Sequence, residues 1–302
     1  MPLPIVDPND WDSICQAIPP TSYLIDPILP ANAKTLLHGP PGSGKSALAW
    51  GMAKAISLGE PYLGLSSTKA KVFMVSTDMT IRELKHRWGG YYKPTCKFMA
   101  IPAVDITKPS FKNTSIHTEF KSHIENEGVE LMVWDALGGL HLGHSARDDE
   151  VADLVDAVLT DWFADKAVIV LGHDRKTRFG PAGDPLPPSN EDFLGSVKWR
   201  ANATNQLHIW SQSRRMSILK HEKCQVGPIH EEEIKLHIGM WGQAELWSEA
   251  RAKDVVGKLF AALKIPAIQK LEGREQDTAI ATHYGVSDRT IRHWRSLANK
   301  SP

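Results

Sequence analysis

The stretch from Gly39 to Ser46 constrains the fold of this chain more than any other. It reads Gly-Pro-Pro-Gly-Ser-Gly-Lys-Ser, the phosphate-binding loop pattern of Gly, four variable residues, Gly, Lys and then Ser or Thr. Glycines let the backbone curl so that several N–H groups point at phosphate oxygens. Lys45 can then reach the β- and γ-phosphates of ATP, and the Ser46 hydroxyl can hold Mg²⁺. The predicted cofactors are therefore ATP and Mg²⁺, bound by Gly39, Pro40, Pro41, Gly42, Ser43, Gly44, Lys45 and Ser46.

The residues around this loop support the prediction. Residues 35–38 form a short apolar run typical of a buried strand, and residues 47–56 have the composition of a helix. A strand, a glycine loop and a helix together aim a helix N-terminus at phosphate. A Gly/Pro turn with an incidental lysine is the alternative, and this context makes it the weaker one.

Composition excludes few classes of protein. The chain has 302 residues, 42% hydrophobic and 23% charged, which predicts one large domain or a large domain with a small appendage. Its formal net charge is zero, so binding of nucleic acid would depend on local patches. The three cysteines show no metal or disulfide spacing, and no apolar run is long enough to span a bilayer. The N-terminus lacks a signal-peptide layout. We expect a cytoplasmic protein with no membrane partner.

Apolar runs alternate with helical stretches from Thr35 to about Ile209, which predicts parallel β-α units. The expected strands are residues 35–38, 71–76, 97–101, 130–134 and 167–172, with helices at 81–88, 116–127 and 149–163. Three later runs with period-two character predict antiparallel strands at 206–211, 216–221 and 233–240. The proline-rich residues 1–30 are expected to wrap the outside of the core. Two long polar loops, Gly138–Arg147 and Thr177–Asp192, are of the kind that is usually functional or mobile.

Polar residues end three of the expected strands. Asp135 follows the apolar run 131–134 and is the candidate magnesium acid, acting through water. Asp78 ends another such run and could orient or deprotonate water, although it could instead cap the helix that starts near Thr80. His173 could sense the γ-phosphate, or it could be only a satisfied polar group at a strand end.

These strand ends, in this order, resemble those of the RecA-like ATPases, and most closely the hexameric replicative helicases of the plasmid RepA type. The resemblance covers about Leu24 to Trp247 and implies an α/β fold, a RecA-like P-loop NTPase with a mostly parallel central sheet. Asp78 stands where the family has a catalytic Glu, and His173 with Lys176 resembles its His-containing sensor motif.

Two further elements of the resemblance concern the subunit boundary. Gly195-Ser196, followed by Arg200, is similar to the family's Arg-Gly-Ser-Ser stretch, although Leu194 replaces the leading Arg. Residues 223–227 look like the Lys-x-Asn/Arg-x-Gly element, with Gln225 at the Asn or Arg position. In the family this element reaches a neighbour's nucleotide, so Lys223 would be the remaining cation.

The family also implies a homo-oligomer, a ring of six subunits with ATP between neighbours and single-stranded DNA in the centre. Cations near the second long loop could follow the phosphates of that strand without reading sequence. For each of them taken alone, an ordinary solvated surface charge is the favoured alternative. Trp199 beside them could stack on a base or belong to the core. The candidate DNA contacts of this region are Arg175, Lys176, Arg178, Lys198 and Arg200.

The C-terminal residues resemble a helix-turn-helix, a small all-α unit. Ala281 is small where two helices would cross, and Gly285 would take the turn. Its core would comprise Ile280, Tyr284, Val286, Ile291 and Trp294, helped by a preceding helix at 255–263. Its DNA-facing cations would be Arg289, Arg292 and Arg295, although such units also dock proteins. We expect a RecA-like ATPase/helicase core over 1–250 and this unit over 255–302, which would bind duplex DNA or a replication protein.

The sequence therefore predicts an ATP-dependent DNA motor, a RepA-like replicative helicase that moves along single-stranded DNA. The residues assigned to catalysis are Lys45, Asp78, Asp135, His173 and Lys223. Two alternatives share the fold: a DNA-binding initiator or regulator that uses ATP as a switch, and a RecA-like recombinase. A metabolic P-loop kinase is a third, but it has no use for a helix-turn-helix.

Overall fold

The computed structural model describes residues 8–77, 79–88, 95–100, 114–136, 149–163, 165–175, 186, 192–194, 196–213, 216–238, 243–247, 262–263, 265–284, 291–292 and 295. The chain divides into two compact units, Met1–Ala244 and Glu245–Pro302. No helix among the described residues is long and apolar enough to cross a membrane.

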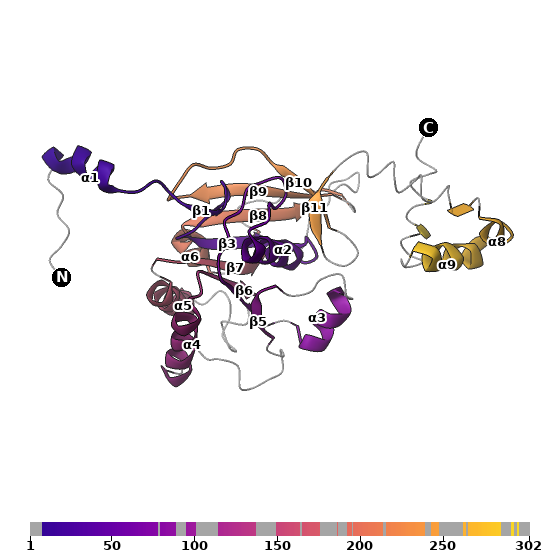
Figure 1. Ribbon diagram of the computed structural model, residues 1–302, viewed down its shortest axis with the longest axis horizontal. Coiled ribbons are helices and arrows are strands. Elements are labelled where there is room, and N and C mark those ends of the chain that lie inside the picture. Colours follow the sequence, from indigo (N-terminus) through magenta and orange to yellow (C-terminus); the bar gives the residue numbers. More distant parts are fainter. Residues whose placement is uncertain are drawn as a thin grey trace. The chain divides into compact units, whose positions relative to one another are not determined.

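The elements follow one another in a mixed α/β order (Figure 1). The helices are η1 (Pro8–Asp10), α1 (Trp11–Ala17), α2 (Lys45–Leu58), α3 (Ile81–Trp88), α4 (Thr114–Glu127), α5 (Asp149–Trp162), α6 (Val197–Asn202), α8 (Pro266–Gln269) and α9 (Gly273–Tyr284). The strands are β1 (Tyr23–Ile25), β2 (Leu29–Pro30), β3 (Lys34–Gly39), β4 (Val72–Ser76), β5 (Lys97–Ala100), β6 (Leu131–Asp135), β7 (Ala167–His173), β8 (Asn205–Ser211), β9 (Ser217–Cys224), β10 (Ile234–Ile238) and β11 (Ala244–Leu246).

Nine strands form one central sheet in the order β11-β10-β9-β8-β3-β7-β6-β4-β5. The six strands from β8 to β5 pair in parallel, whereas β9 is antiparallel to both β8 and β10. The predicted mostly parallel α/β sheet is confirmed.

The prediction that 206–211 belongs to a purely antiparallel set was wrong, because β8 pairs in parallel with β3 on one side and antiparallel with β9 on the other. Period-two alternation does not encode strand direction, and here α6 carries the chain back so that β8 enters parallel to β3.

Both faces of the parallel strands β3, β4, β6 and β7 are buried, which explains why these strands read as continuous apolar runs. Strand β6 illustrates the alternation, because successive side chains of a strand point to opposite faces. Leu131 and Val133 pack in the cluster that contains α2, whereas Met132 and Trp134 pack in the cluster that contains residues of α4, α5 and α6. Helix α2 therefore covers one face, and the other three helices cover the opposite face.

The N-terminal segment contributes to the core, so the prediction that residues 1–30 only wrap its outside was wrong in part. Hairpin β1–β2 and its turn bury four apolar side chains in the cluster that contains α2: Leu24, Ile25, Ile28 and Leu29. These residues lie between prolines, and the proline content concealed the apolar pattern. Helix α1, by contrast, has no buried residue.

Helix α2 is enclosed by this arrangement. Its buried residues point in most directions around its axis, from Leu48 and Trp50 to Met52 and Ile56. They share one cluster with the sheet strands and with the β1–β2 hairpin. A helix that is apolar on all sides is a buried helix, and α2 fits that description.

Helix α3 begins with a capping box at Thr80 and Glu83. The Thr80 hydroxyl accepts from the Glu83 N–H at 3.2 Å, and the Glu83 carboxylate accepts from the Thr80 N–H at 2.7 Å. These bonds satisfy N–H groups that the first turn of a helix leaves without partners. Thr80 is thus the cap of this helix, a role that the sequence had offered as the alternative for Asp78.

The second unit has a small apolar core of its own, comprising Ala262, Ile268, Ile280, Ala281 and Ile291. The predicted core positions Ile280 and Ile291 are buried, as is the small residue Ala281. All of residues 285–290, with the predicted turn and Val286, lie outside the described residues, as does Trp294, and the Tyr284 side chain is not described. The helix-turn-helix therefore stays a prediction.

The two-faced core can be tested by truncating one buried side chain. Met132→Ala should lower the free energy of unfolding by about 2–5 kcal/mol, because it removes a fully buried side chain and leaves a cavity. Ile81→Ala, at a position that is 64% exposed, is the matched control and should change it by less than about 0.5 kcal/mol. Urea unfolding of both variants provides the measurement, and equal losses would contradict the assignment.

Candidate nucleotide site

The glycines of the loop between β3 and α2 meet distinct backbone requirements. A Cβ at Gly39 would lie 1.9 Å from the Ile209 carbonyl oxygen, so only glycine lets β3 end this close to β8. Gly42 and Gly44 have φ angles of +79° and +101°, which side chains rarely tolerate. Space is open around the position of a Gly42 Cβ, with no described atom within 4 Å. The loop is thus shaped as a cradle whose backbone can approach a phosphate.

Lys45 lies inside this cradle. Its side chain is buried, and its ammonium donates to the carbonyl oxygens of Gly39 at 2.7 Å and Pro40 at 2.9 Å. Phosphate oxygens are stronger acceptors for an ammonium than peptide carbonyls are. The predicted phosphate-binding lysine is therefore positioned at the loop that it would serve.

The Ser46 hydroxyl donates to an Asp135 carboxylate oxygen at 3.2 Å, which joins the start of α2 to the end of β6. Asp135 is only 3% exposed. Hydroxyl and carboxylate oxygens are the ligands that Mg²⁺ uses beside nucleotide phosphates, so this pair fits the predicted metal. Ser46, together with Asp135 acting through water, would hold Mg²⁺ there, and the ion would supply positive charge that offsets the negative charge on the phosphates.

Thr77 holds the magnesium acid in position, and the sequence did not single it out. Its N–H donates to the Asp135 carbonyl oxygen at 2.6 Å, and its hydroxyl accepts from the Ala136 N–H at 3.1 Å. The end of β4 is thereby bonded to the end of β6. The only available signal was a polar residue at the end of an apolar strand, directly before Asp78. Asp78 itself lies outside the described residues.

His173 ends β7 at the same edge of the sheet, paired in register with Gly39. The next residue, Asp174, donates its N–H to the Gly39 carbonyl oxygen at 2.9 Å, and Leu194 donates its N–H to the His173 carbonyl oxygen at 2.7 Å. The structure thus gathers Lys45, Ser46, Asp135 and His173 at the carboxyl ends of neighbouring parallel strands, where ligands bind in open α/β sheets.

Lys223 is not brought to this edge of its own subunit. It lies on β9 opposite Gln206, near the start of β8, while the other end of β9 approaches the loop through Ser217, whose hydroxyl donates to the Ser43 carbonyl oxygen at 3.1 Å. The Lys223 ammonium donates to carbonyl oxygens at the end of α6, at 3.3 Å for Arg200 and 3.0 Å for Ala201. Partial burial, together with the Arg200 charge, lowers the pKa of Lys223.

An open hollow of about 700 Å³ lies over α6, β8 and β9 next to Lys223. Its lining includes three cations and two carboxylates as well as polar and apolar side chains: Arg200, Gln206, Lys220, His221, Glu222, Lys223, Ile229 and Glu231. Burial lowers the pKa of His221 to about 4, so this histidine is neutral at pH 7.

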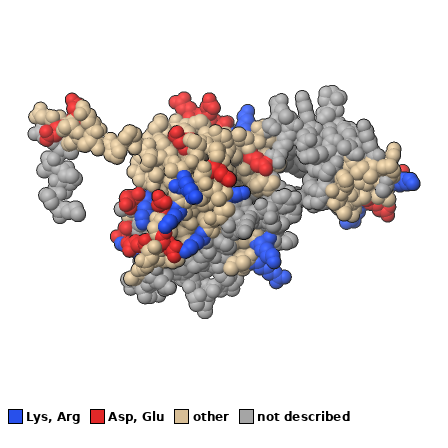
Figure 2. Space-filling view, in the orientation of Figure 1, with Lys and Arg blue, Asp and Glu red and all other residues tan. Residues whose placement is uncertain are grey.

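The predicted DNA contacts of the first unit differ in availability. Arg175 is exposed directly after β7, whereas Lys198 is paired with Asp153 and Arg200 lies 3.6 Å from Glu222. Lys176 and Arg178 lie outside the described residues. On the face drawn in Figure 2, Lys and Arg are interspersed with Asp and Glu rather than gathered in a basic patch.

Trp199 belongs to the core and is not a base-stacking platform. It is 5% exposed and packs in the cluster on the α5 side of the sheet. In the second unit, Arg292 is exposed, whereas the Arg295 Nε donates to an Asp277 carboxylate oxygen at 2.6 Å. Arg289 lies outside the described part of the chain.

A phosphate-binding loop after the central strand of this mostly parallel sheet, with an aspartate at the end of β6, defines a RecA-like P-loop nucleotide-binding fold. The ATPase domain of G40P shares this fold, with a TM-score of 0.54 and 13% identity over 80% of this chain and 96% of that one. A KaiC-like protein from the archaeon Pyrococcus horikoshii is also similar, with a TM-score of 0.49 and 13% identity over 74% of this chain and 94% of that one.

Residues 2–178 match the AAA domain family, and because the match spans more than half of the chain, the protein belongs to that family. It is a P-loop ATPase. No curated protein sequence matches the chain significantly.

Neutralising the magnesium acid tests the metal site. Asp135→Asn should raise the Mg²⁺ concentration that half-saturates ATP hydrolysis by about 10–100-fold, because a polar group that orients a bound metal has lost its charge. Asp156→Asn, which neutralises a partly buried carboxylate paired with Lys34, should leave the Mg²⁺ requirement unchanged. Titration of activity with Mg²⁺ compares the two, and an unaltered requirement in Asp135→Asn would rule out this assignment.

Proposed function

We propose that this ATPase is a motor acting on DNA, a RepA-like replicative helicase that couples ATP hydrolysis to movement along single-stranded DNA. The observation that carries the nucleotide chemistry is the Ser46–Asp135 bond beside Lys45, at one end of a RecA-like sheet. The DNA assignment is supported by the motifs at Asp78, His173, Gly195-Ser196 and Lys223, whose order resembles that of the RepA-type helicases.

We assign Asp78 the task of positioning the attacking water. It follows Thr77, which bonds to the end of the strand that carries Asp135. An acid in the next position would lie near the same edge of the sheet. The alternative role as a helix cap is filled by Thr80. Asp is one methylene shorter than the family's Glu, so its carboxylate would reach less far toward the attacking water.

The position of Lys223 favours action across a subunit boundary. Lys223 lies at the end of β9 that is away from the phosphate-binding loop of its own chain. We therefore assign it to the nucleotide of a neighbouring subunit, where it would stabilise the negative charge that develops during phosphoryl transfer. Its bonds to the carbonyl oxygens of Arg200 and Ala201 would be exchanged for phosphate. A ring of six subunits with ATP between neighbours would provide this geometry, and hydrolysis would then depend on assembly.

Single-stranded DNA would be held by cations that follow β7. Arg175 is exposed there, and Lys176 and Arg178 continue the same segment. Lys198 and Arg200 are weaker candidates, because each is already close to a carboxylate. In the C-terminal unit, Arg292 and Arg289 are better candidates for duplex DNA than Arg295, which is bonded to Asp277.

Removing the loop lysine separates ATP chemistry from DNA binding. Lys45→Ala should lose ATP hydrolysis and its stimulation by single-stranded DNA, because no cation then meets the β- and γ-phosphates. Binding of a fluorescent single-stranded oligonucleotide should persist. Lys54→Ala, also on α2 but beyond the loop, should keep both activities. Hydrolysis that single-stranded DNA does not stimulate in the wild type would argue against a DNA motor.

The departures from the family pattern at Asp78, Leu194 and Gln225 favour a second candidate, an initiator or regulator that uses ATP only to assemble on DNA. A strand-displacement assay distinguishes the two, since only the helicase separates strands. Mass measurement and electron microscopy, with a non-hydrolysable ATP analogue and an oligonucleotide, distinguish a closed ring from the open filament of a recombinase.

A further inference from the structure

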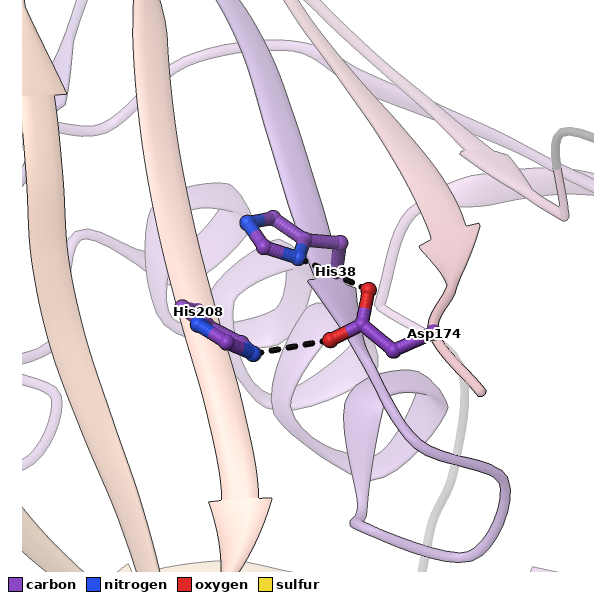
Figure 3. Close-up of side chains that lie close together, drawn as sticks. All are labelled: His38, Asp174 and His208. Atoms are coloured by element: carbon purple, nitrogen blue, oxygen red, sulfur yellow. Dashed lines mark hydrogen bonds and ion pairs between the residues drawn. The ribbon is translucent and has the colours of Figure 1, made fainter. Parts of the chain in front are cut away.

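Four titratable side chains meet behind the phosphate-binding loop, one from each of four neighbouring chain segments. They are His38 on β3, Asp174 directly after β7, His208 on β8 and Glu222 on β9, which we call the histidine–carboxylate array. Figure 3 shows both imidazole rings directed at the two oxygens of Asp174. His38, Asp174 and His208 are buried, and Glu222 reaches the hollow over β9.

Each ring of the array faces both carboxylates. His208 lies 2.8 Å from Asp174 through Nε2 and 3.0 Å from Glu222 through Nδ1. His38 lies 3.0 Å from Asp174 through Nδ1 and 3.5 Å from Glu222 through Nε2. A neutral imidazole has one N–H and one lone pair, so it can donate to only one of two carboxylates. The hydrogen bonds at His208 are complete only when that ring carries both protons.

A second proton on His208 would complete a hydrogen bond from each of its ring nitrogens, which is not so for His38. The His38 Nε2 makes no hydrogen bond to any described residue, whereas both His208 nitrogens are at bonding distance. The rings stack with centroids 4.1 Å apart, so two adjacent cations would repel each other. Burial opposes the charge on His208, but its bonds to Asp174 and Glu222 outweigh that cost and raise its pKa. Among the described residues, Trp210 also packs on His208, Phe193 packs on His38, and Arg200 lies 3.6 Å from Glu222.

The stacking also argues against a metal ion in this array. Ligand atoms of His38, Asp174 and His208 lie within 4.8 Å of one another, so their separation alone would allow them to share a cation. A metal must lie about 2.0–2.1 Å from each histidine nitrogen, along a lone pair in the plane of the ring. Two rings 4.1 Å apart and only 23° from parallel direct their lone pairs side by side, so they do not meet at that distance.

The array joins the nucleotide loop to the proposed subunit boundary. His38 immediately precedes Gly39, and the Asp174 N–H donates to the same Gly39 carbonyl oxygen that accepts from Lys45. At the other end, Glu222 is the neighbour of Lys223 and lies beside Arg200. One hydrogen-bonded path therefore runs from the loop across β3, β7 and β8 to β9.

We propose that the histidine–carboxylate array is a proton-dependent brace that positions the phosphate-binding loop relative to the boundary strand β9, and that the brace is complete only while His208 is doubly protonated. When His208 loses its second proton, its Nδ1 lone pair faces Glu222 and the bond between β8 and β9 side chains is lost. The role in positioning Lys223 rests on the proposed function, but the proton dependence of the brace does not.

The sign of the effect on stability follows from the raised pKa. The contribution of His208 is fully present below its unfolded pKa of about 6.5 and is lost as the pH rises through its folded pKa. Asp174 and Glu222 have lowered pKa values, so their contributions are lost only in acid, well outside this range. The brace should therefore weaken as the pH rises above about 6.5 and through the folded pKa of His208.

Glu222→Gln is the decisive variant. A glutamine amide can donate to the Nδ1 lone pair, so neutral His208 would be fully bonded between Gln and Asp174 without its second proton. For the wild type, we expect the folding equilibrium constant to fall as the pH rises from about 6.5 through the folded pKa of His208, by up to about tenfold per pH unit, the limit for one released proton. For Glu222→Gln the fall should be absent. Glu231→Gln, which alters another carboxylate of the hollow, should behave as the wild type.

The experiment is urea unfolding of the full chain without nucleotide across this pH range, followed by kcat and KM for ATP over the same range. In the wild type, both the folding equilibrium constant and kcat should fall as the pH rises. The absence of both falls in Glu222→Gln supports the proposal. His208→Gln removes the titrating group and should also abolish the fall, which gives a second test if Glu222→Gln does not fold.

Three results would overturn the proposal. The first is a wild type whose folding equilibrium constant does not fall as the pH rises, or a Glu222→Gln variant whose constant falls as much as that of the wild type. Another is an altered unfolding profile with an unchanged kcat profile, which would make the array a structural element only. The third is loss of stability on adding EDTA that Zn²⁺ restores, which would make the array a metal site. A protein that lacks DNA-stimulated hydrolysis would refute the proposed function, yet its unfolding profile would still decide whether the brace exists.

Discussion

The bond between the Ser46 hydroxyl and the Asp135 carboxylate ties two elements that lie far apart in the sequence, the start of α2 and the end of β6. It exists because β3 and β6 are parallel strands of one sheet, so their carboxyl ends open on the same edge. Thr77 fixes the end of β6, and Gly39 lets β3 approach β8 closely enough to shape the loop. The nucleotide site is thus a property of the sheet topology as much as of the loop sequence.

Much of that topology could be predicted from residues 35–173, because strands buried on both faces are continuous apolar runs and helices are not. The ends of those runs also gave the positions of Asp135 and His173, since polar residues stand out after apolar ones. The loop motif gave Lys45 and Ser46 directly. These predictions depend on local patterns, which a single sequence contains.

What the sequence could not supply was pairing between distant segments. The direction of β8 depends on the crossover through α6, and the buried hairpin of Leu24 to Leu29 depends on contacts with α2. The histidine–carboxylate array shows the same limit: His38, His208 and Glu222 have no distinctive spacing and meet only because β3, β8 and β9 are neighbours. Lys223 was assigned to catalysis from a motif, and only strand register reveals that it is remote from the loop of its own chain.

The enclosure of α2 bears on how the proposed motor could convert ATP hydrolysis into movement. The helix that receives the phosphates is wedged between the sheet and the β1–β2 hairpin, with its apolar surface occupied on both sides. Closely packed interiors resist gradual deformation, so this helix would stay fixed in the proposed motor. In the proposed motor, movement that follows phosphate release would therefore begin at the ends of the strands rather than in the helix beneath the nucleotide.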